Sequence, residues 1–216
     1  MMNIDSIDNI DMDDSQGKLI VISGPSGSGK STVVKELLAF GGYKLSVSAT
    51  ARKPRENEKD GIDYHFISKK KFENKISNHE MLEYVEYSGN YYGTLKEPVE
   101  KMLIEKYNVI LEIEIDGAMN IKEEFPDTVM IFLTPPTYSE LERRLRGRGT
   151  ESEDSINKRL ERAKKEVNFI NQYDYFVINE TDMQKKAAFD INGIVESEKN
   201  KINQKKAEKF LKNYFS

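Results

Sequence analysis

The sequence predicts an α/β fold in which a parallel sheet is flanked by helices and carries an inserted mixed α/β subdomain. Short runs are apolar at every position, as expected for parallel strands buried on both faces. Stretches with helical periodicity lie between these runs, and alternating strands and helices favour a parallel sheet covered on both sides. Residues 49–98 are instead rich in charge and tyrosine, which indicates an insertion with short strands of its own.

Each apolar run is a candidate strand of the parallel sheet. The runs span residues 19–22, 45–47, 109–115, 129–133 and 176–178. Helices are predicted where residues of one face recur every three or four positions, at 99, 102, 103 and 106 and at 156, 160, 163, 167 and 170. The end of the chain predicts a basic amphipathic helix, which we place at 201–216.

Composition excludes several classes of function. The chain has 216 residues and no cysteine, which excludes a disulfide framework and favours a reducing compartment, the cytoplasm. Two histidines without cysteine leave no credible zinc site. A net charge of −4 gives no general attraction to nucleic acid, and no apolar run approaches the length of a membrane span. We therefore expect neither nucleic acid nor a membrane as a partner, while the choice between a monomer and a homo-oligomer stays open.

The first sixteen residues form an acidic segment. A signal peptide begins with basic residues, so this segment is not expected to be an export signal. Its charge and lack of a periodic apolar pattern predict a disordered tail rather than a functional arm.

A phosphate-binding motif follows the first predicted strand. Residues 24–31 fit the pattern G-x-x-x-x-G-K-[ST] and join a buried strand to a helix, which is the context that a P-loop requires. Glycines let consecutive backbone N–H groups point at phosphate oxygens, and the helix N-terminus adds partial positive charge. Lys30 is expected to reach the β and γ phosphates, and Ser31 to hold Mg²⁺ through its hydroxyl. The flanks disfavour a chance glycine turn, and the candidate nucleotide-binding residues are Gly24, Pro25, Ser26, Gly27, Ser28, Gly29, Lys30, Ser31 and Thr32.

Two arginines in the loop after the second strand suit a second phosphate. Arg52 and Arg55 bracket Pro54, whose ring stiffens the loop. Two guanidinium groups can bind a phosphate dianion through bidentate hydrogen bonds, although isolated loop arginines are more often solvated.

A second arginine group lies in the segment YSELERRLRGRG. Arg144 and Arg148 are four residues apart and share a face if the helix containing them continues. Arginines on a mobile flap suit phosphoryl transfer because charge spreads over the equatorial oxygens of the transferring group. The alternative is an exposed charged helix, and we accept it for Arg143 and Arg146.

Eight segments between about residues 18 and 195 match a known enzyme family in order and spacing. They are SGPSGSGKST, SVSATARKPR, GIDYHF, SGNYYGT, LEIEIDGA, FLTPP, RLRGRGTES and YDYFVIN. Through these segments the chain resembles the guanylate kinases, which phosphorylate GMP. The resemblance implies a P-loop core, an inserted GMP-binding subdomain and a small helical LID that closes over ATP.

The resemblance also implies roles for the residues that match the family's motifs. The phosphate of GMP would be held by Arg52, Arg55, Tyr64 and Tyr92. Guanine would be read by Ser48, Glu83 and Thr94, with an acidic contribution near Glu112. Adenine would be approached by Asn179. The residues expected to act on the transferring phosphates are Lys30, Arg52, Arg144, Arg148 and Arg159.

The chemistry of guanine agrees with the role implied for Glu83. Guanine presents N1–H and the 2-amino group side by side, and one carboxylate can accept from both. Hydroxyls such as those of Ser48 and Thr94 can donate to O6 and N7. Adenine has an unprotonated N1 at the same edge, and such a mismatch can reduce kcat/KM for the wrong nucleotide by several powers of ten. Without these neighbours, a surface glutamate would be the simpler interpretation of Glu83.

The tyrosine-rich stretch around Glu83, residues 83–94, is expected to fold back on itself. Gly89-Asn90 suits the turn that brings its two ends to one pocket. Of its four tyrosines we assign only Tyr92 to the site, and Tyr84, Tyr87 and Tyr91 to packing or the rim.

Three acids alternate in LEIEID, where many members of the family have aspartate or glutamine. Alternation predicts that Glu112, Glu114 and Asp116 share one face of a strand near its C-terminal end, where ligands collect in open α/β sheets. Magnesium would be held by Ser31 with Glu114 acting through water, although the division of work among the acids stays open.

The expected domain organisation follows from these assignments. Residues 1–16 form the tail, 17–48, 99–137 and 160–200 the P-loop core, 49–98 the GMP-binding subdomain, 138–159 the LID and 201–216 the C-terminal helix. The expected reaction is direct transfer of the γ-phosphoryl of Mg-ATP to GMP, and also to dGMP. A kinase for AMP, UMP or CMP and a non-catalytic interaction module are the alternatives; Glu83 disfavours the first, and the intact Lys30 and Ser31 disfavour the second.

Overall fold

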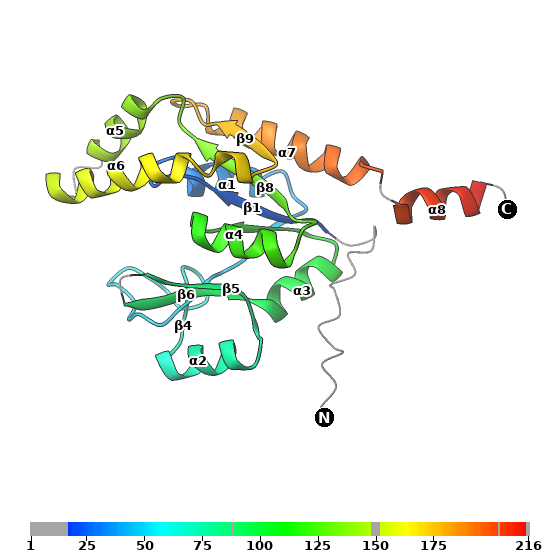
Figure 1. The fold of residues 1–216 in the computed structure, drawn as a ribbon, viewed down its shortest axis with the longest axis horizontal. Helices are drawn as coiled ribbons and strands as arrows, with labels where there is room; N and C mark the ends of the chain where they lie inside the picture. Colours follow the sequence, from blue (N-terminus) through cyan, green and yellow to red (C-terminus); the bar gives the residue numbers. More distant parts are fainter. Residues whose placement is uncertain (1–16, 88, 148–151, 203, 215–216) are drawn as a thin grey trace.

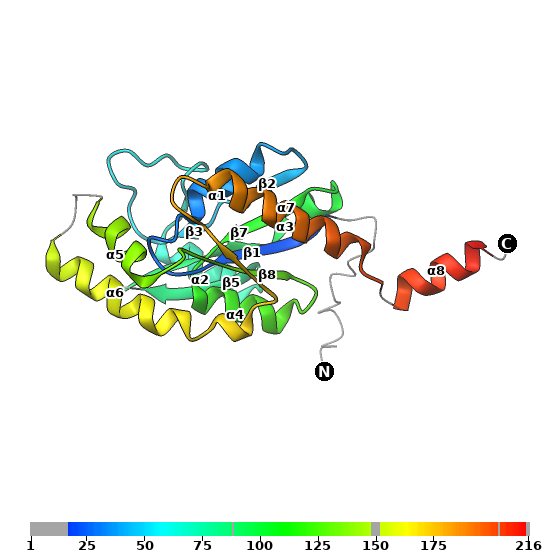
Figure 2. The ribbon, with the colours of Figure 1, turned by 90° about the horizontal axis from the view of Figure 1, so that it is seen from above.

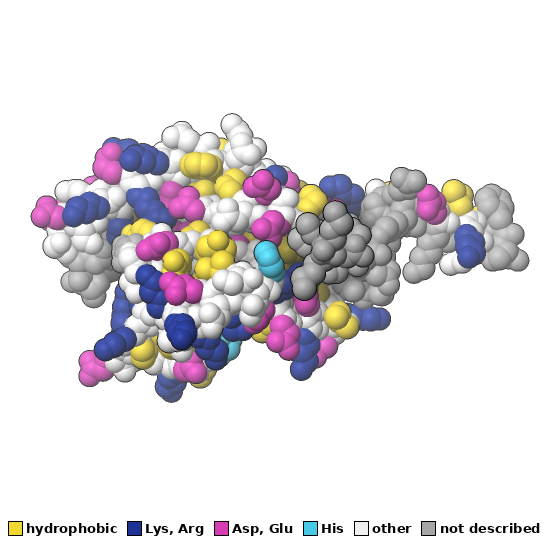
Figure 3. Space-filling view, turned by 60° about the horizontal axis from the view of Figure 1, so that its bottom comes forward, with side chains coloured by type: hydrophobic (Ala, Val, Ile, Leu, Met, Phe, Trp, Pro, Cys, Tyr) yellow, Lys and Arg dark blue, Asp and Glu magenta, His cyan; other side chains and the backbone are white. Residues whose placement is uncertain are grey.

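The computed structural model describes residues 17–87, 89–147, 152–202 and 204–214. The expected disordered tail, residues 1–16, lies outside the described residues. Within the described part, no helix is both long enough and apolar enough to cross a membrane. Figure 3 shows Lys and Arg side chains interspersed with Asp and Glu over the face that it displays.

The larger sheet is parallel throughout, as predicted. Its strands run in the order β2-β7-β1-β8-β9. Their bounds are β1 Leu19–Ser23, β2 Tyr43–Leu45, β7 Asn108–Glu112, β8 Val129–Thr134 and β9 Tyr175–Ile178.

Helices cover both faces of this sheet (Figure 2). Helices α1 (Lys30–Leu38) and α7 (Gln184–Asn200) pack on one face, against Ile20 and Ile22 of the central strand β1. Helices α3 (Lys96–Ile104) and α4 (Ile115–Glu124) cover the other face, where the alternate β1 residues Leu19 and Val21 are buried. Because successive residues of a strand point to opposite faces and both faces are buried, β1 is apolar from Leu19 to Ile22, which explains the run that predicts it.

A second, mixed sheet lies beside α4 (Figure 1). Its order is β4-β3-β6-β5, from β3 Ala49–Thr50, β4 His65–Phe66, β5 Met81–Tyr87 and β6 Asn90–Leu95. Helix α2 (Lys69–Ser77) packs on it through the buried Phe72, whose ring stacks on Tyr91 at 5.3 Å. The insertion predicted in this region is therefore a mixed subdomain with a small core of its own.

Two helices, α5 (Tyr138–Arg146) and α6 (Glu153–Val167), form a pair at the end of the larger sheet (Figure 1). Their shared apolar cluster consists of Leu141, Leu145, Ile156, Leu160 and Ala163. Helix α6 continues across residues 159–160 and α3 across residues 98–99. The expected segment boundaries at these positions stay predictions, and both fall inside helices.

Four expected elements differ in extent from those observed. The second strand lies at Tyr43–Leu45 instead of 45–47, and the run at 109–115 ends as a strand at Glu112. The chain leaves the sheet there because Ile113 and Ile115 are both buried in the cluster under α4, so Ile115 already begins that helix. The helical pattern expected up to residue 170 ends at Val167, and Lys106 lies beyond α3 with a φ of 67°.

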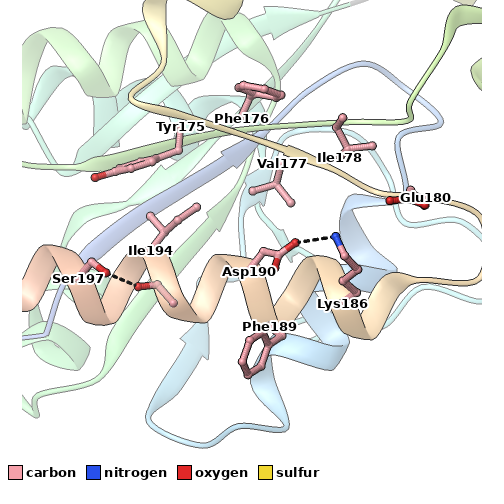
Figure 4. Close-up of a pocket in the computed structure, with 11 residues that line it drawn as sticks. Tyr175, Phe176, Val177, Ile178, Glu180, Lys186, Phe189, Asp190, Ile194 and Ser197 are labelled. Carbon is pink, nitrogen blue, oxygen red and sulfur yellow. Dashed lines mark hydrogen bonds and ion pairs between the residues drawn. The ribbon is translucent and has the colours of Figure 1, made fainter.

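The C-terminal helix is observed as α8 (Gln204–Tyr214), which extends away from the body of the molecule (Figures 1 and 2). A groove between strand β9 and helix α7 is lined in part by exposed apolar side chains, among them Phe176, Ile178 and Phe189 (Figure 4). No residue of the phosphate loop lines this groove.

Candidate active site

The phosphate loop, residues 24–29, connects β1 to α1. Gly24 and Gly29 have φ angles of 146° and 88°, which side chains disfavour. A Cβ atom at Gly24 would lie 2.0 Å from the carbonyl oxygen of Leu133, and one at Gly29 would lie 2.5 Å from Asn179 Nδ2. Only glycine therefore allows the loop to pass this close to β8 and to the chain after β9.

Lys30 begins α1 and folds its side chain back over the loop. Its Nζ donates hydrogen bonds to the carbonyl oxygens of Gly24, at 2.7 Å, and Pro25, at 3.4 Å. Burial lowers the pKa of the Lys30 ammonium, while the nearby carboxylates of Glu114 and Glu112 raise it in opposition. The ammonium is thus held inside the cradle that the loop forms.

Ser31 and Glu112 meet where β1 and β7 end side by side. The Ser31 hydroxyl donates to Glu112 Oε1 at 2.6 Å. Parallel strands bring their carboxyl ends to one edge of the sheet, so the two residues converge although they are 81 positions apart. Within the described part of the chain, no group of three or more His, Cys, Asp and Glu side chains could hold a metal ion by itself.

The prediction that Glu112, Glu114 and Asp116 share one strand face is wrong. The strand ends at Glu112, Glu114 is the N-cap residue of α4, and Asp116 lies in the first turn of that helix. Alternation implies a shared face only within a strand, and here the chain turns into a helix after one of the three acids. Acidic side chains near a helix N-terminus interact favourably with its dipole.

Two arginines of the helical pair lie on the phosphate loop. Arg144 of α5 donates to the carbonyl oxygens of Ser28, at 3.2 Å, and Asn179, at 2.8 Å. Arg159 of α6 donates to the Ser26 hydroxyl through Nε at 3.2 Å and Nη2 at 2.5 Å. The structure therefore brings both side chains to the loop that the sequence motif defines.

Arg148 lies outside the described residues. The face that Arg148 was expected to share with Arg144 therefore stays a prediction. Arg143 and Arg146 pair on the helix surface with Glu140 and with Glu142 and Glu153, respectively, in agreement with their assignment to an exposed charged helix.

Asn179 follows β9 and contacts the phosphate loop through its side chain. Its Nδ2 donates to the carbonyl oxygen of Ser28 at 2.8 Å, and its side chain is buried. Its expected approach to adenine stays a prediction. Thr32 is exposed in the first turn of α1.

The mixed subdomain gathers Arg52, Tyr64 and Tyr92. The guanidinium carbon of Arg52 lies 5.0 Å from the centroid of the Tyr64 ring, and the Tyr64 and Tyr92 rings meet edge to face at 6.1 Å. Arg52 belongs to the loop after β3, Tyr64 precedes β4 and Tyr92 lies on β6, which are neighbours in the sheet order. Arg55 is exposed in the same loop, and Ser48 lies immediately before β3.

Glu83 and Thr94 form a buried pair on adjacent strands. They are cross-strand partners in the β5–β6 hairpin, and the Thr94 hydroxyl donates to Glu83 Oε1 at 2.8 Å. Their exposed fractions are only 5% and 1%. Burial raises the pKa of Glu83 to about 7, although the hydrogen bond from Thr94 acts in the opposite direction. Ionisation of this carboxyl group is costly in the free protein. Hydrogen-bond donors on a ligand would therefore stabilise its ionised form strongly.

The hairpin confirms the expected turn and separates the four tyrosines. Gly89 has a φ of 74° at the turn between β5 and β6. Tyr84 and Tyr87 are exposed, whereas Tyr91 packs on Phe72. These three positions agree with packing or rim roles.

Several residues of the site escape detection in the sequence. Gly117 of α4 is one, because a Cβ atom there would lie 2.6 Å from Glu83 Oε2. Arg162 of α6 is another: it pairs with Glu114 at 3.0 Å and Glu166 at 2.7 Å, and its guanidinium lies 4.9 Å from the Tyr87 ring centroid. For Gly117, the only local signal is the tetrapeptide IDGA within one of the matching segments. For Arg162 there is no such signal, because its helix contains many other charged residues.

Comparisons with known proteins agree with this geometry. The sequence model of the family described as guanylate kinase matches residues 16–198. A guanylate kinase of Clostridioides difficile is 50% identical over 192 residues, which cover 88% of this chain and 93% of the relative. One from Listeria innocua is 49% identical over 185 residues, covering 85% and 89%.

A solved structure shares the architecture as well. The crystal structure of guanylate kinase from Anaplasma phagocytophilum superposes with a TM-score of 0.70 at 33% identity, covering 87% of this chain and 88% of that one. Family model, relatives and solved structure all span the P-loop sheet together with the mixed subdomain. The chain belongs to the guanylate kinase family.

Proposed function

We propose that this guanylate kinase transfers the γ-phosphoryl group of ATP to GMP by direct in-line attack, with Glu83 and Thr94 selecting guanine. The chain is an ATP:GMP phosphotransferase by family membership. The observation that carries the residue-level proposal is the buried Glu83–Thr94 pair, since a nearly inaccessible carboxylate beside a hydroxyl needs donors from a ligand. Guanine supplies two such donors, and adenine does not.

The phosphate of GMP would be held by the arginine and tyrosine group of the mixed subdomain. Arg52 offers a planar guanidinium for bidentate binding, and the hydroxyls of Tyr64 and Tyr92 add neutral donors. Arg55 is exposed in the same loop and can approach a dianion without prior rearrangement of a core contact. Ser48 would add a further contact to the base, and Glu112 would add an acidic group near it. These groups recognise base and phosphate, so dGMP should also be accepted.

The phosphates of ATP would lie on the loop at residues 24–29. Lys30 would exchange its contacts with loop carbonyls for contacts with the β and γ phosphates. Ser26 and Ser28 of the loop and Thr32 in the first turn of α1 would bind the same nucleotide. Arg144 and Arg159 already contact the loop and would neutralise charge on the transferring group, together with Arg148. Asn179 would approach adenine. No covalent intermediate is required, because both phosphates can be held in line.

The residues beside the loop fit a magnesium ion. Mg²⁺ prefers oxygen ligands and usually retains several waters, and Ser31 and the nearby carboxylates offer only oxygens. Ser31 would hold it through the hydroxyl that now donates to Glu112, and Glu114 would act through water. When bound, Mg²⁺ would neutralise charge on the phosphates.

Closure of the molecule would exclude water from the transfer. The GMP-binding subdomain, residues 49–98, and the LID, residues 138–159, would move towards the core, because an open site of lysine and arginine would permit hydrolysis of ATP. We place the reaction in the cytoplasm, where a chain without cysteine is at no disadvantage and both nucleotides are available.

A panel of phosphoryl acceptors tests the proposal. ADP production is measured with ATP and GMP, dGMP, AMP, UMP or CMP in parallel. GMP is expected to be the best acceptor, followed by dGMP. A higher turnover with AMP or with a pyrimidine nucleotide would show that the base pocket is misassigned, and nucleotide binding without any turnover would indicate an interaction module.

A further inference from the structure

Glu58 holds one edge of the Arg52 guanidinium. Arg52 Nη1 donates to Glu58 Oε2 at 2.6 Å, and Nη2 donates to Oε1 at 2.7 Å. The remaining hydrogen of Nη1 is directed to the carbonyl oxygen of Lys53 at 3.0 Å. Glu58 Oε2 also accepts from the backbone N–H of Arg55 at 2.8 Å, so this one carboxylate contacts both arginines of the loop after β3.

The opposite edge of the same guanidinium makes no bond to Glu58, although the hydroxyls of Tyr92 and Tyr64 interact with the guanidinium. Nε and Nη2 share that edge, and each keeps one hydrogen after the bonds to Glu58 are made. Arg52 Nε is buried and has no hydrogen-bond partner among the described residues. The edge carries parallel donors of the kind that bind a phosphate through two hydrogen bonds.

Aromatic rings fix the plane of the guanidinium. It lies 5.0 Å from the Tyr64 centroid and 5.5 Å from the Phe66 centroid. The side chains of Arg52 and Glu58 are 13% and 16% exposed, so the pair is partly removed from water. The bond from Arg52 keeps the pKa of Glu58 at about 2, and the carboxylate therefore remains ionised at any working pH.

We propose that Glu58 is a positioning residue for the GMP phosphate: it orients Arg52 so that the Nε–Nη2 edge faces the phosphate, and it remains bound during catalysis. This inference rests on the proposed function. The competing arrangement is one in which Glu58 mimics the phosphate and must be displaced by it. The two arrangements predict opposite signs for the effect of removing the Glu58 charge on GMP affinity.

The test compares Glu58→Gln with Glu56→Gln, a matched change at an exposed residue of the same loop. A glutamine amide can accept from only one of the two Arg52 donors, while its NH₂ group opposes the other. We expect Glu58→Gln to raise the KM for GMP about tenfold or more, with kcat changed less than threefold and the KM for ATP unchanged. Glu56→Gln should match the wild type.

Two further measurements separate positioning from a general structural role. Guanosine lacks the phosphate, so its inhibition constant should be the same for Glu58→Gln and wild type. In an Arg52→Ala background, Glu58→Gln should lose most of its effect on the KM for GMP, because only the contact with the Arg55 N–H remains.

An unchanged or lowered KM for GMP in Glu58→Gln would overturn the assignment, as would an equal loss of guanosine binding or an additive effect in the double variant. The proposed function has a separate control. A wild-type protein that fails to phosphorylate GMP would refute both, whereas an active wild type with an unaffected Glu58→Gln variant would refute the role of Glu58 alone.

Discussion

Replacing Glu83 with glutamine should stabilise the free protein while it weakens GMP recognition. Burial raises the pKa of this carboxyl from 4.5 to about 7 in the folded state. The folded protein therefore holds the proton more tightly than the unfolded chain does. A difference of about 2.5 units at ~1.4 kcal/mol per unit corresponds to about 3 kcal/mol. This contribution to the free energy of unfolding is present below pH 4.5 and is lost as the pH rises through 7.

Glutamine removes that pH dependence because it is never ionised. Its side-chain oxygen can still accept the hydrogen bond from Thr94. Urea unfolding of the ligand-free protein at pH 5 and pH 8 measures the effect. We expect Glu83→Gln to exceed the wild type by up to about 3 kcal/mol at pH 8 and by less than about 1 kcal/mol at pH 5. The control is Glu86→Gln, at an exposed residue of the same strand, which should follow the wild type at both values.

The same substitution should reduce kcat/KM for GMP by about a hundredfold. The carboxylate accepts two hydrogen bonds from guanine, whereas the amide accepts one and turns its own N–H donor towards the second guanine donor. The transition state for GMP therefore loses about 3 kcal/mol of stabilisation. The KM for ATP should change little. An advantage of the variant over the wild type that is no larger at pH 8 than at pH 5, or full activity of the variant with GMP, would refute the reasoning about the buried carboxylate.

The remaining predictions concern residues around this pair. Gly117→Ala places a Cβ atom 2.6 Å from Glu83 Oε2, so the KM for GMP should rise about tenfold, although alanine favours the helix. A normal KM in steady-state assays would show that the position of Glu83 does not depend on the space beside Gly117. Arg162→Ala leaves Glu166, which is 6% exposed, without its ion-pair partner and should lower the free energy of unfolding by about 2 kcal/mol at pH 8. Since burial raises the pKa of Glu166, protonation should lessen that loss at pH 5, and a larger loss in urea unfolding at pH 5 would contradict this explanation.

The sequence was sufficient for the parts of the fold in which local pattern and tertiary environment agree. The run in β1 is apolar at each position because both faces of that strand are buried. The glycines of the phosphate loop and Gly89 in the hairpin mark backbone conformations that other residues disfavour. These features depend on neighbouring residues in the chain, so they can be predicted from a single sequence.

Other features depend on contacts between distant segments. The alternation of Glu112, Glu114 and Asp116 implied a strand, but the strand ends at Glu112 and Ile115 already begins helix α4. Arg162 meets Glu114, which is 48 positions away, and nothing near Arg162 in the sequence distinguishes it from the solvated charges of the same helix. Glu58 is only six residues from Arg52, yet its role depends on the loop conformation that directs both side chains to one point.

The ratio of kcat/KM for GMP to that for AMP, with ATP as the donor, tests the central claim most directly. Glu83 can accept from both guanine donors, whereas adenine would offer the buried carboxylate no N1–H and would place the lone pair of N1 opposite it. We predict a ratio of at least about 10⁴ for the wild type, and a ratio reduced by about two powers of ten in Glu83→Gln. A wild-type ratio near one, or a ratio that Glu83→Gln leaves unchanged, would contradict the account of how this site selects its acceptor.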